Sequence, residues 1–364
     1  MSDITITDPA EESARAALGD MLHSPAPVID AAAAARIVSR HYGIRAAAHP
    51  LACERDANFQ MVPAQGKGCI LKVSNPAEPA VSIQFQNQAL LWLERRDPGL
   101  PVPKVVPALD GRSEFLLEMP DGRSSMVRLL TWLDGVPVAR IGVSPALRRD
   151  LGRTLARLGA ALVDFDHPGA SHAILWDIKH ALRLRPLLAS LPRDALKSQL
   201  LAELDHFDAE VAPLLPGLRQ QVVHNDLNLH NVLLNPDDPD RVTGVLDFGD
   251  MVKTPLVIDL AVAASYQTHL GDDALASACE IVGAYHGVRP LERREVALLR
   301  DLIVARLMTS IVITEWRAAR YPQNAAYILR NNGPARIGMA RFASLPRETT
   351  TAALLAACQM ESTP

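Results

Sequence analysis

The chain has 364 residues, of which 48% are hydrophobic and 21% charged, a composition typical of a folded protein with a substantial core. Its 37 lysines and arginines stand against 41 aspartates and glutamates, and the resulting net charge of -4 argues against a sequence-independent nucleic-acid binder, which normally carries a basic surplus. Aromatic residues make up only 4%, which also argues against a stacking platform for single-stranded nucleic acid.

The spacing of the cysteines and the length of the apolar segments indicate in which cellular compartment the protein works. The cysteines lie far apart in the sequence without CxxC spacing, so we interpret them as thiols of a reducing compartment. The N-terminus lacks the basic and apolar regions of a signal peptide, and the apolar stretch over residues 302–314 is interrupted by Arg306 and too short to cross a bilayer. We therefore expect a cytoplasmic protein without a membrane partner. The cysteines are Cys53, Cys69, Cys279 and Cys358.

Two helices are predicted near the N-terminus. Residues 1–27 are polar and end in Ser-Pro-Ala-Pro, which predicts a flexible leader with one short helix over residues 11–22. Asp30 is a suitable N-cap for a helix over residues 31–41, and Gly43 is suited to end it.

Strand-like segments follow these helices. Residues 59–62 and 69–73 flank a turn rich in proline and glycine, which predicts a hairpin. Residues 82–95 then have apolar positions in a helical run. A second pair of strands is predicted over residues 115–119 and 125–130, joined by the turn sequence Pro-Asp-Gly.

The character of the sequence changes at Asp134. From there it is mainly helical, apart from short strands near Val222 and over residues 232–234 and 242–246. The sequence therefore predicts an α+β fold with two lobes. A small N-terminal lobe with an antiparallel β-sheet spans residues 28–133, and a larger, mainly helical lobe spans residues 134–364.

A group of polar residues lies between the short strands of the second lobe. Asp226 and Asn231 belong to the loop that separates two of these strands, and Asp247 follows a third strand. The three side chains should therefore meet at one end of a small sheet. Mg²⁺ prefers oxygen ligands and leaves room for phosphate and water, so Asn231 and Asp247 are candidate metal ligands. Asp226 is then left to orient a hydroxyl group and accept its proton.

The spacing within this region matches a known catalytic pattern. His224, Asp226 and Asn231 follow the HxDxxxxN arrangement of the kinase catalytic loop, and Asp247-Phe-Gly follows Asn231 after sixteen residues. We interpret His224 as structural, bonded to the backbone of its own loop. A zinc site of His224, Asp226 and His230 is disfavoured, because no fourth ligand with suitable spacing follows.

Phosphoryl transfer also requires positive charge at the nucleotide phosphates. Lys72, a lone lysine in an apolar strand, is the candidate, although a solvated lysine at a sheet edge would look the same. The sequence has neither a Walker A motif nor a GxGxxG loop. We therefore expect the turn over residues 54–59 to cover the phosphates, with Asn58 near them.

At these residues the chain resembles the aminoglycoside phosphotransferase and choline-kinase-like superfamily, which has the protein-kinase-like fold, and within it the hydroxylysine kinase group. The similarity extends from about residue 41 to about residue 332. Besides the catalytic loop, it rests on residues 53–59, 70–78, 85–90, 127–135, 176–177, 247–250 and 259–261.

The resemblance implies roles for individual residues. Asp226 would be the catalytic base, and Lys72 would contact the α- and β-phosphates of the nucleotide. Leu130 to Leu133 would form the interlobe hinge, so that Thr131 and Leu133 face the purine. Asp259 would brace the catalytic loop. Mg²⁺, held by the two ligands named above, and ATP or GTP as phosphoryl donor are the implied cofactors.

One family feature is missing from the sequence. A helix glutamate normally pairs with the strand lysine, but glutamines occupy this stretch at positions 84, 86 and 88. Either a glutamine, Glu78 or Glu94 takes this place, or Lys72 is held differently.

The resemblance implies a small-molecule kinase that transfers the γ-phosphoryl group to a hydroxyl of an amino acid or amino alcohol. Such an acceptor needs carboxylates for its ammonium group and a cation for its carboxylate. Homoserine kinase and aminoglycoside phosphotransferase activities are alternatives within the same class, and a catalytically inactive nucleotide-binding module is the alternative of another class. Trp176 and Trp316 are expected in the core. Candidate contacts to the acceptor are Asp134, Asp177, Asn228 and Arg306, with Glu315 and Arg317 as further charged residues.

Overall fold

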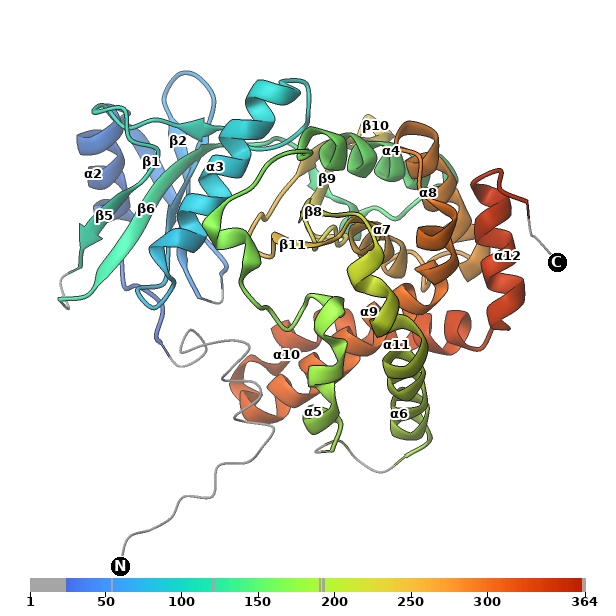
Figure 1. Cartoon of the computed structure of the whole chain (residues 1–364). Coiled ribbons are helices and arrows are strands. Elements are labelled where there is room, and N and C mark those ends of the chain that lie inside the picture. The colour runs from blue at the N-terminus through green and yellow to red at the C-terminus, as the bar shows by residue number, and fades with distance from the viewer. Residues whose placement is uncertain (1–23, 54, 120–121, 190, 192–193, 362–364) are drawn as a thin grey trace, which may run out of the picture.

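The computed structural model describes residues 24–361 apart from residues 54, 120–121, 190 and 192–193, and it has two lobes (Figure 1). The predicted helix over residues 11–22 and part of the predicted turn before Gly122 lie outside the described residues. The small lobe contains α2 (Ala31–Tyr42), β1 (Ala46–Leu51), β2 (Ala57–Pro63), β3 (Cys69–Val73), α3 (Ala80–Arg96), β4 (Val105–Val106), β5 (Phe115–Glu118) and β6 (Ser124–Thr131).

The larger lobe is mainly helical. Its helices are α4 (Pro145–Ala161), α5 (Arg185–Ala189), α6 (Ala195–His206), α7 (Leu256–Ser265), α8 (Ala274–Val288), α9 (Arg293–Arg320), α10 (Ala325–Ile328), α11 (Asn332–Gly338) and α12 (Arg347–Ala357). Its strands are β7 (Val136–Pro137), β8 (Gln220–Val223), β9 (Val232–Asn235), β10 (Asp238–Val245) and β11 (Val252–Pro255). Short 3₁₀ or π segments lie at Val138–Arg140, Pro168–Ser171, Ile178–Leu184, Phe207–Val211, Ala212–Gly217, Pro322–Asn324, Leu329–Asn331 and Met339–Ala343.

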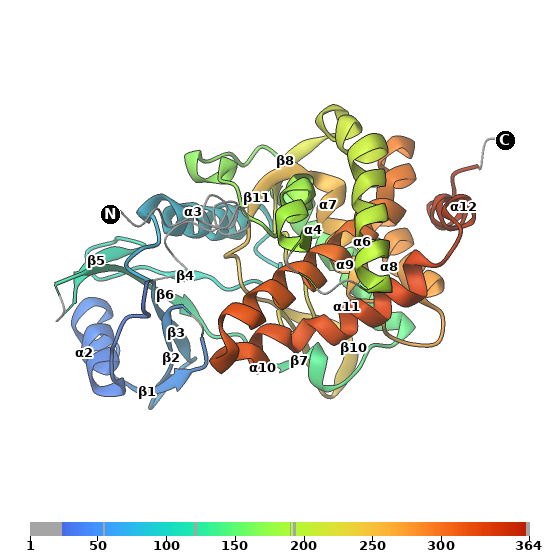
Figure 2. The same cartoon turned by 90° about the horizontal axis from the view of Figure 1, so that it is seen from below.

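The sheet of the small lobe is antiparallel throughout. The described strands follow the order β1-β2-β3-β6-β4, with β5 also paired to β6. Helix α2 and helix α3 lie on opposite faces of this sheet (Figure 2). Leu71 and its neighbours at alternate positions pack with α2, whereas Ile70 and Leu130 belong to the core that includes α3. Because side chains alternate along a strand, Lys72 lies on the α3 face.

The predicted helix boundary and hairpin are confirmed. Asp30 caps α2 by accepting a hydrogen bond from the N–H of Ala33, and Gly43 ends it with a left-handed φ of 70°. Strands β2 and β3 pair as the predicted hairpin. Strand β1 was not predicted, because its sequence, which contains three alanines and a proline, lacks both the β-branched residues and the alternation that indicate a strand.

Helix α9 is the centre of the larger lobe. Its 28 residues include an almost continuous buried segment from Leu298 to Thr314, so the helix is enclosed on all sides. Arg300 on this helix pairs with Glu203 of α6 at 3.1 Å, and Arg347 of α12 pairs with the same carboxylate at 2.7 Å. These ion pairs connect three helices. No helix within the described residues is both long and apolar enough to span a bilayer.

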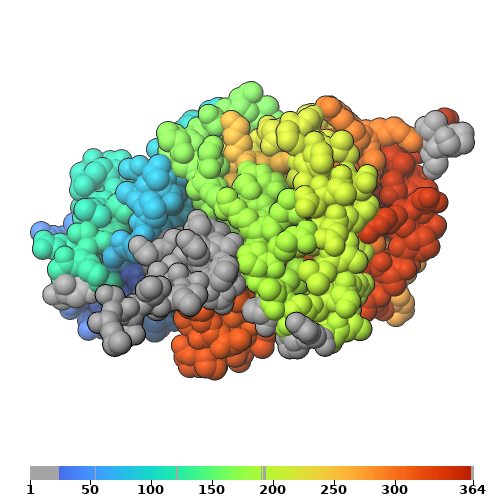
Figure 3. All heavy atoms as spheres, turned by 60° about the horizontal axis from the view of Figure 1, so that its bottom comes forward, coloured from blue at the N-terminus to red at the C-terminus, as the bar shows by residue number. Residues whose placement is uncertain are grey.

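The two lobes meet along α3. Phe85 of α3 stacks on Phe165 with 6.0 Å between ring centroids, and Trp92 donates a hydrogen bond to the carbonyl of Ala161 at 2.8 Å. In the space-filling view the light-blue surface of the small lobe adjoins the green part of the larger lobe (Figure 3). Helix α3 is therefore packed against both lobes.

Candidate active site

A buried aspartate fixes the loop between β8 and β9. Asp259 of α7 accepts hydrogen bonds from the backbone N–H groups of Asn225 at 2.7 Å and His224 at 3.4 Å. Asn225 has a left-handed φ of 64°, so the chain turns sharply at this residue. The contact expected of a bracing residue is thus present at Asp259, and the turn sets the position of Asp226.

His224 connects this loop to the chain that leads to Asp247. Its Nδ1 accepts a hydrogen bond from the N–H of Asp226 at 3.2 Å, so its proton is assigned to Nε2, which donates to the carbonyl of Leu246 at 2.9 Å. The ring is fully buried and lies edge-on to Phe248. His224 therefore connects the loop that contains Asp226 to the segment that leads to Asp247.

Asp226 receives donors at both carboxylate oxygens. Asn228 and Asn231 donate to Oδ2 at 2.9 and 2.8 Å. Arg306 of α9 and the hydroxyl of Tyr266 donate to Oδ1 at 3.1 and 3.4 Å. Burial, together with the nearby carboxylate of Asp250, raises the pKa of Asp226 above its usual value, and Arg306 opposes this shift.

Asn231 and Asp247 provide the oxygen atoms of a candidate metal site. The side-chain N–H₂ group of Asn231 is bonded to Asp226, which leaves Oδ1 of Asn231 as the atom available to a cation. Burial alone would raise the pKa of Asp247, but Lys72 and the N–H of Gly249 lower it, so this carboxylate is ionised. In the part of the chain that the structure describes, no group of three or more His, Cys, Asp and Glu residues could hold a metal ion. This small donor set fits Mg²⁺ that takes its other ligands from phosphate and water.

Lys72 faces the same region from the small lobe. It lies on β3 directly opposite Asn58 of β2 and Arg128 of β6. Within the described residues no carboxylate lies within ion-pair distance of Lys72, and Glu94 is paired instead with Lys104 at 3.1 Å. Glu94 is therefore excluded as the partner of Lys72.

The glutamine-rich stretch of α3 binds Arg128 rather than Lys72. The guanidinium group of Arg128, which is 3% exposed, donates to the side-chain oxygens of Asn87, at 2.9 Å, and Gln86. Asn87 in turn donates to Glu114 at 2.6 Å. Amide groups thus fix α3 to the sheet beside Lys72, where a glutamate was expected from the resemblance. Burial raises the pKa of Glu78, and the nearby cations Arg55, Arg128 and Lys72 lower it in part.

The other predicted nucleotide contacts come from β2 and from the end of β6. The prediction that Asn58 lies in a turn is wrong. Asn58 lies within β2, and the chain turns before Ala57. Its Oδ1 atom is buried and has no hydrogen-bond partner among the described residues. Thr131 ends β6 and is bonded to Lys104 through both its N–H and its hydroxyl oxygen. Leu133 follows and is half-buried.

Two of the predicted acceptor contacts are corrected by the structure. Asp177 is completely buried, accepts a hydrogen bond from Thr254 at 3.0 Å and pairs with Lys179 at 3.0 Å, so it cannot reach an acceptor. Asn228 is 2% exposed and its side chain is bonded within the catalytic loop. Asp134 is exposed beyond the end of β6.

Among the predicted acceptor contacts, Arg306 donates to Asp226, as Asn228 does. It is 1% exposed, donates to the carbonyl of Trp176 at 2.9 Å, and lies 5.2 Å from the Trp176 ring centroid. Of the other charged candidates, Glu315 pairs with Arg336. Trp316 is buried in the core as predicted, whereas Trp176 is half-buried beside Arg306.

Sequence reasoning missed Tyr266 and Asp250. Tyr266 caps the end of α7, seven residues after Asp259, and only tertiary structure reveals that its hydroxyl reaches Asp226. Asp250 follows Asp247-Phe-Gly and is half-buried. Its position directly after a recognised motif was a signal that could have marked it as a site residue.

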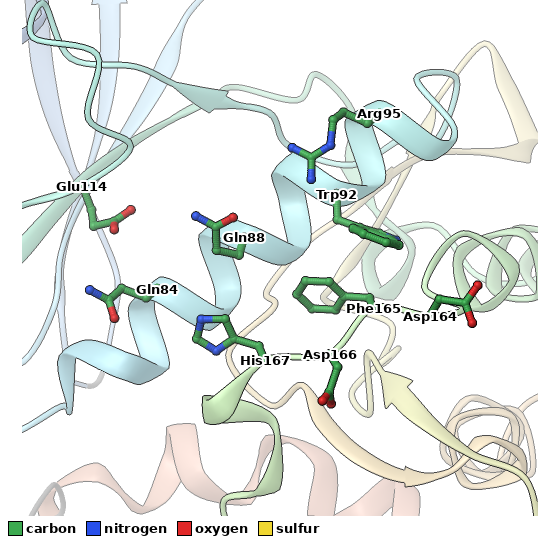
Figure 4. Close-up of a pocket in the computed structure, with 9 residues that line it drawn as sticks. All are labelled: Gln84, Gln88, Trp92, Arg95, Glu114, Asp164, Phe165, Asp166 and His167. Carbon is green, nitrogen blue, oxygen red and sulfur yellow. The ribbon is translucent and has the colours of Figure 1, made fainter.

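A separate hollow lies between α3 and residues 164–167 (Figure 4). Its carboxylates have partners, since Asp166 pairs with Lys253 at 3.1 Å and Glu114 accepts from Asn87. Neither Asp226 nor Asp247 lines it. The hollow is therefore distinct from the candidate active site.

The sequence profile of the phosphotransferase enzyme family known as APH matches residues 53–296. The chain belongs to this family. As a member it is a small-molecule kinase, which transfers a phosphoryl group from a nucleotide to a hydroxyl group of a small acceptor. The family predicted from the catalytic loop is confirmed.

Relatives of this kinase include hydroxylysine kinases of vertebrates. The protein of Danio rerio is 30% identical over 305 residues, which cover 80% of this chain and 85% of the relative. The protein of Mus musculus is 27% identical and covers 84% and 87% of the two chains. A homoserine kinase of Methylobacterium nodulans is 31% identical over a shorter range, covering 49% of this chain and 53% of its own.

Solved structures confirm the predicted bilobal fold. A microcompartment-associated aminopropanol kinase superposes with a TM-score of 0.66 at 21% identity, covering 89% of this chain and 98% of its own. The amicoumacin kinase hAmiN, in complex with AMP-PNP, Ca²⁺ and amicoumacin, gives a TM-score of 0.64 at 15% identity, with coverages of 88% and 97%. At these identities the likeness shows the fold.

Proposed function

We propose that this kinase uses Mg²⁺ with ATP or GTP to phosphorylate the hydroxyl group of a small amino acid or amino alcohol, with hydroxylysine as the leading acceptor. The observation that supports this most is the adjacency of a base and a metal site. Asp226 accepts a hydrogen bond from the side chain of Asn231, whose oxygen atom is left for the cation. Several relatives that match most of the chain are hydroxylysine kinases, which supports this acceptor class.

In the proposed reaction, the acceptor oxygen attacks the γ-phosphorus of the nucleotide and the bond from that phosphorus to the bridging oxygen breaks. Asp226 accepts the proton of the acceptor hydroxyl. Asn231 and Asp247 would hold Mg²⁺, which offsets the negative charge of the phosphates. Lys72 would contact the α- and β-phosphates, with Asn58 opposite it on β2.

The lobes would divide this work. We assign nucleotide binding to residues 28–133, with Thr131 and Leu133 beside the purine, and the catalytic loop and acceptor site to residues 134–364. His224 and Asp259 would support the catalytic loop through the hydrogen bonds described above.

Charge around the base supports an acceptor with an amino group. The carboxylates of Asp226, Asp247 and Asp250 influence one another, and Arg306 is the cation bonded to Asp226 among the described residues. No hydrogen bond to Asp250 occurs within the described chain. An ammonium group placed at Asp250 would offset this excess of negative charge.

Homoserine and aminoglycosides are the alternative acceptors. A homoserine kinase matches part of the chain, and aminoglycoside phosphotransferases share the fold. An inactive nucleotide-binding module is less well supported, because Lys72, Asp226, Asn231 and Asp247 are all present and a scaffold has no need of this set.

A nucleotide-consumption assay tests the proposal. ATP and GTP are each combined with hydroxylysine, homoserine, ethanolamine, choline and an aminoglycoside, with and without Mg²⁺. We expect Mg²⁺-dependent consumption with hydroxylysine above that with the other acceptors. Consumption with another acceptor alone would replace hydroxylysine, and no turnover together with no nucleotide binding would contradict the proposed function.

A further inference from the structure

The hydrogen-bonding capacity of Asp226 is filled in the structure. A carboxylate has about four lone-pair positions. Within the described residues four donors occupy them: Asn228 and Asn231 at Oδ2, and Arg306 and Tyr266 at Oδ1. A base that is to accept a hydrogen bond from an acceptor hydroxyl must first lose one of these donors.

The two donors at Oδ2 belong to the loop itself. The side-chain oxygen of Asn228 accepts hydrogen bonds from the backbone N–H groups of His230 at 2.8 Å and Asn231 at 3.2 Å. The side chain of Asn231 also donates to the backbone carbonyl of Asp226 at 3.0 Å. Release of either side chain from Oδ2 would break hydrogen bonds that shape the loop. Oδ2 is therefore not the oxygen that becomes free to bind the acceptor hydroxyl.

Arg306 at Oδ1 is equally fixed. Its guanidinium group is buried, donates to the carbonyl of Trp176 at 2.9 Å, and lies 5.2 and 5.7 Å from the ring centroids of Trp176 and Tyr266. It therefore serves as a constant donor that holds Asp226 in place.

Tyr266 is the donor that can leave. Its bond to Oδ1 of Asp226, at 3.4 Å, is the longest of the four, and its side chain is half-buried rather than enclosed. Its hydroxyl also accepts a hydrogen bond from Arg306 at 3.0 Å. The hydroxyl of Tyr266 therefore keeps a partner when it gives up Asp226, which lowers the cost of the exchange.

We infer that the hydroxyl of Tyr266 occupies the position of the acceptor hydroxyl and caps Asp226 until an acceptor displaces it. This inference rests on the proposed role of Asp226 as the base. The cap would keep water from the base in the acceptor-free enzyme. Without it, a water oxygen could attack the γ-phosphorus, the bond to the bridging oxygen would break, and Asp226 would take the proton, giving nucleoside diphosphate and inorganic phosphate.

Tyr266→Phe tests the cap because it removes only the hydroxyl. We expect acceptor-independent release of phosphate from Mg·ATP to rise at least about threefold, since one competing hydrogen bond to the base is lost. The KM of the acceptor that the wild-type enzyme uses should fall, and the KM of the nucleotide should not change. Tyr285→Phe is the matched control, because this buried tyrosine of α8 does not contact Asp226, and it should leave the rate of hydrolysis at the wild-type value.

Unchanged hydrolysis in Tyr266→Phe, or a fall in kcat without a fall in the acceptor KM, would overturn the cap and leave Tyr266 as a structural residue. Tyr266→Met provides a second variant without the hydroxyl, and thermal unfolding checks that each variant is folded. Adding Asp226→Asn to Tyr266→Phe should abolish the extra hydrolysis. If hydrolysis persists in the double variant, the role of Asp226 as the base fails, which is distinct from failure of the cap.

Discussion

At the scale of single residues, the catalytic loop depends on backbone geometry as much as on its acidic side chain. Asn225 has a φ of 64°, and its backbone N–H is bonded to Asp259. Neither polar atom of its own side chain has a hydrogen-bond partner among the described residues. Position 225 therefore requires a residue that tolerates the left-handed conformation. Replacing the asparagine would not break a side-chain hydrogen bond, because its amide makes none among the described residues.

This leads to a prediction for the stability of the loop. Asn225→Gly should change the free energy of unfolding by less than about 1 kcal/mol, because glycine adopts a positive φ readily. Asn225→Val should lower it by about 2 kcal/mol or more, because a branched side chain is strained there. Chemical denaturation of the two variants measures the difference, and equal losses would show that the amide itself stabilises the loop.

At the scale of elements, helices α4 and α8 approach each other closely at a glycine. A Cβ atom built on Gly152 of α4 would lie 2.3 Å from the carbonyl oxygen of Ile281 on α8. No real Cβ contact is this short, so the two helices would have to separate. In contrast, a Cβ atom on Gly287 of α8 would meet nothing within 4 Å.

Substitution of these glycines by alanine should have opposite effects. Gly152→Ala should lower the free energy of unfolding by about 2 kcal/mol, because overpacking of a tight contact forces the backbone to shift. Gly287→Ala should raise it by about 0.5 kcal/mol, because alanine is the better helix former. Urea denaturation monitored by circular dichroism checks both, and a neutral Gly152→Ala would show that the helices are free to separate.

Local signals explain which elements could be predicted. The cap at Asp30, the end at Gly43 and the β2–β3 hairpin depend on residues close in sequence, and these were predicted correctly. Strands β4 and β7 have two residues each, too few to show an alternating pattern.

The spacing of the catalytic loop predicted that Asp226, Asn231 and Asp247 would meet at one end of a small sheet. Asp226 and Asn231 are hydrogen-bonded, but β8 and β9 belong to two different sheets, and the further partners of these residues were not predicted. Arg128 donates hydrogen bonds to the side-chain amides of α3, and Tyr266 donates one to Asp226. Both interactions form only because the folded chain brings distant segments together. The burial of Asp177 likewise depends on its contact with Thr254, which is 77 residues away. No local pattern in the sequence reports such contacts.

At the scale of the whole molecule, the candidate site lies where the two lobes face each other. Lys72 and Asn58 come from the sheet of the small lobe, and Asp226, Asn231 and Asp247 come from loops of the larger one. A ligand that contacts both sets stabilises the folded protein by mass action, by about 2.7 kcal/mol at one hundred times its dissociation constant.

The metal dependence of this stabilisation is a further prediction. Nucleotide with Mg²⁺ should raise the melting temperature more than nucleotide with a chelator, because Asp247 would hold the ion that binds the phosphates. In Asp247→Asn the two conditions should give the same, smaller shift. Thermal unfolding measures this, and a full Mg²⁺-dependent shift in the variant would show that the ion is held elsewhere.

Asp226→Asn tests whether Asp226 is the base of the phosphoryl transfer. Transfer of phosphate to the acceptor should fall by about a hundredfold or more, the usual contribution of a general base. Binding of Mg·nucleotide, measured by calorimetry, should stay close to that of the wild-type enzyme, because Lys72 and Asp247 remain. Undiminished turnover in Asp226→Asn would show that Asp226 is not the base.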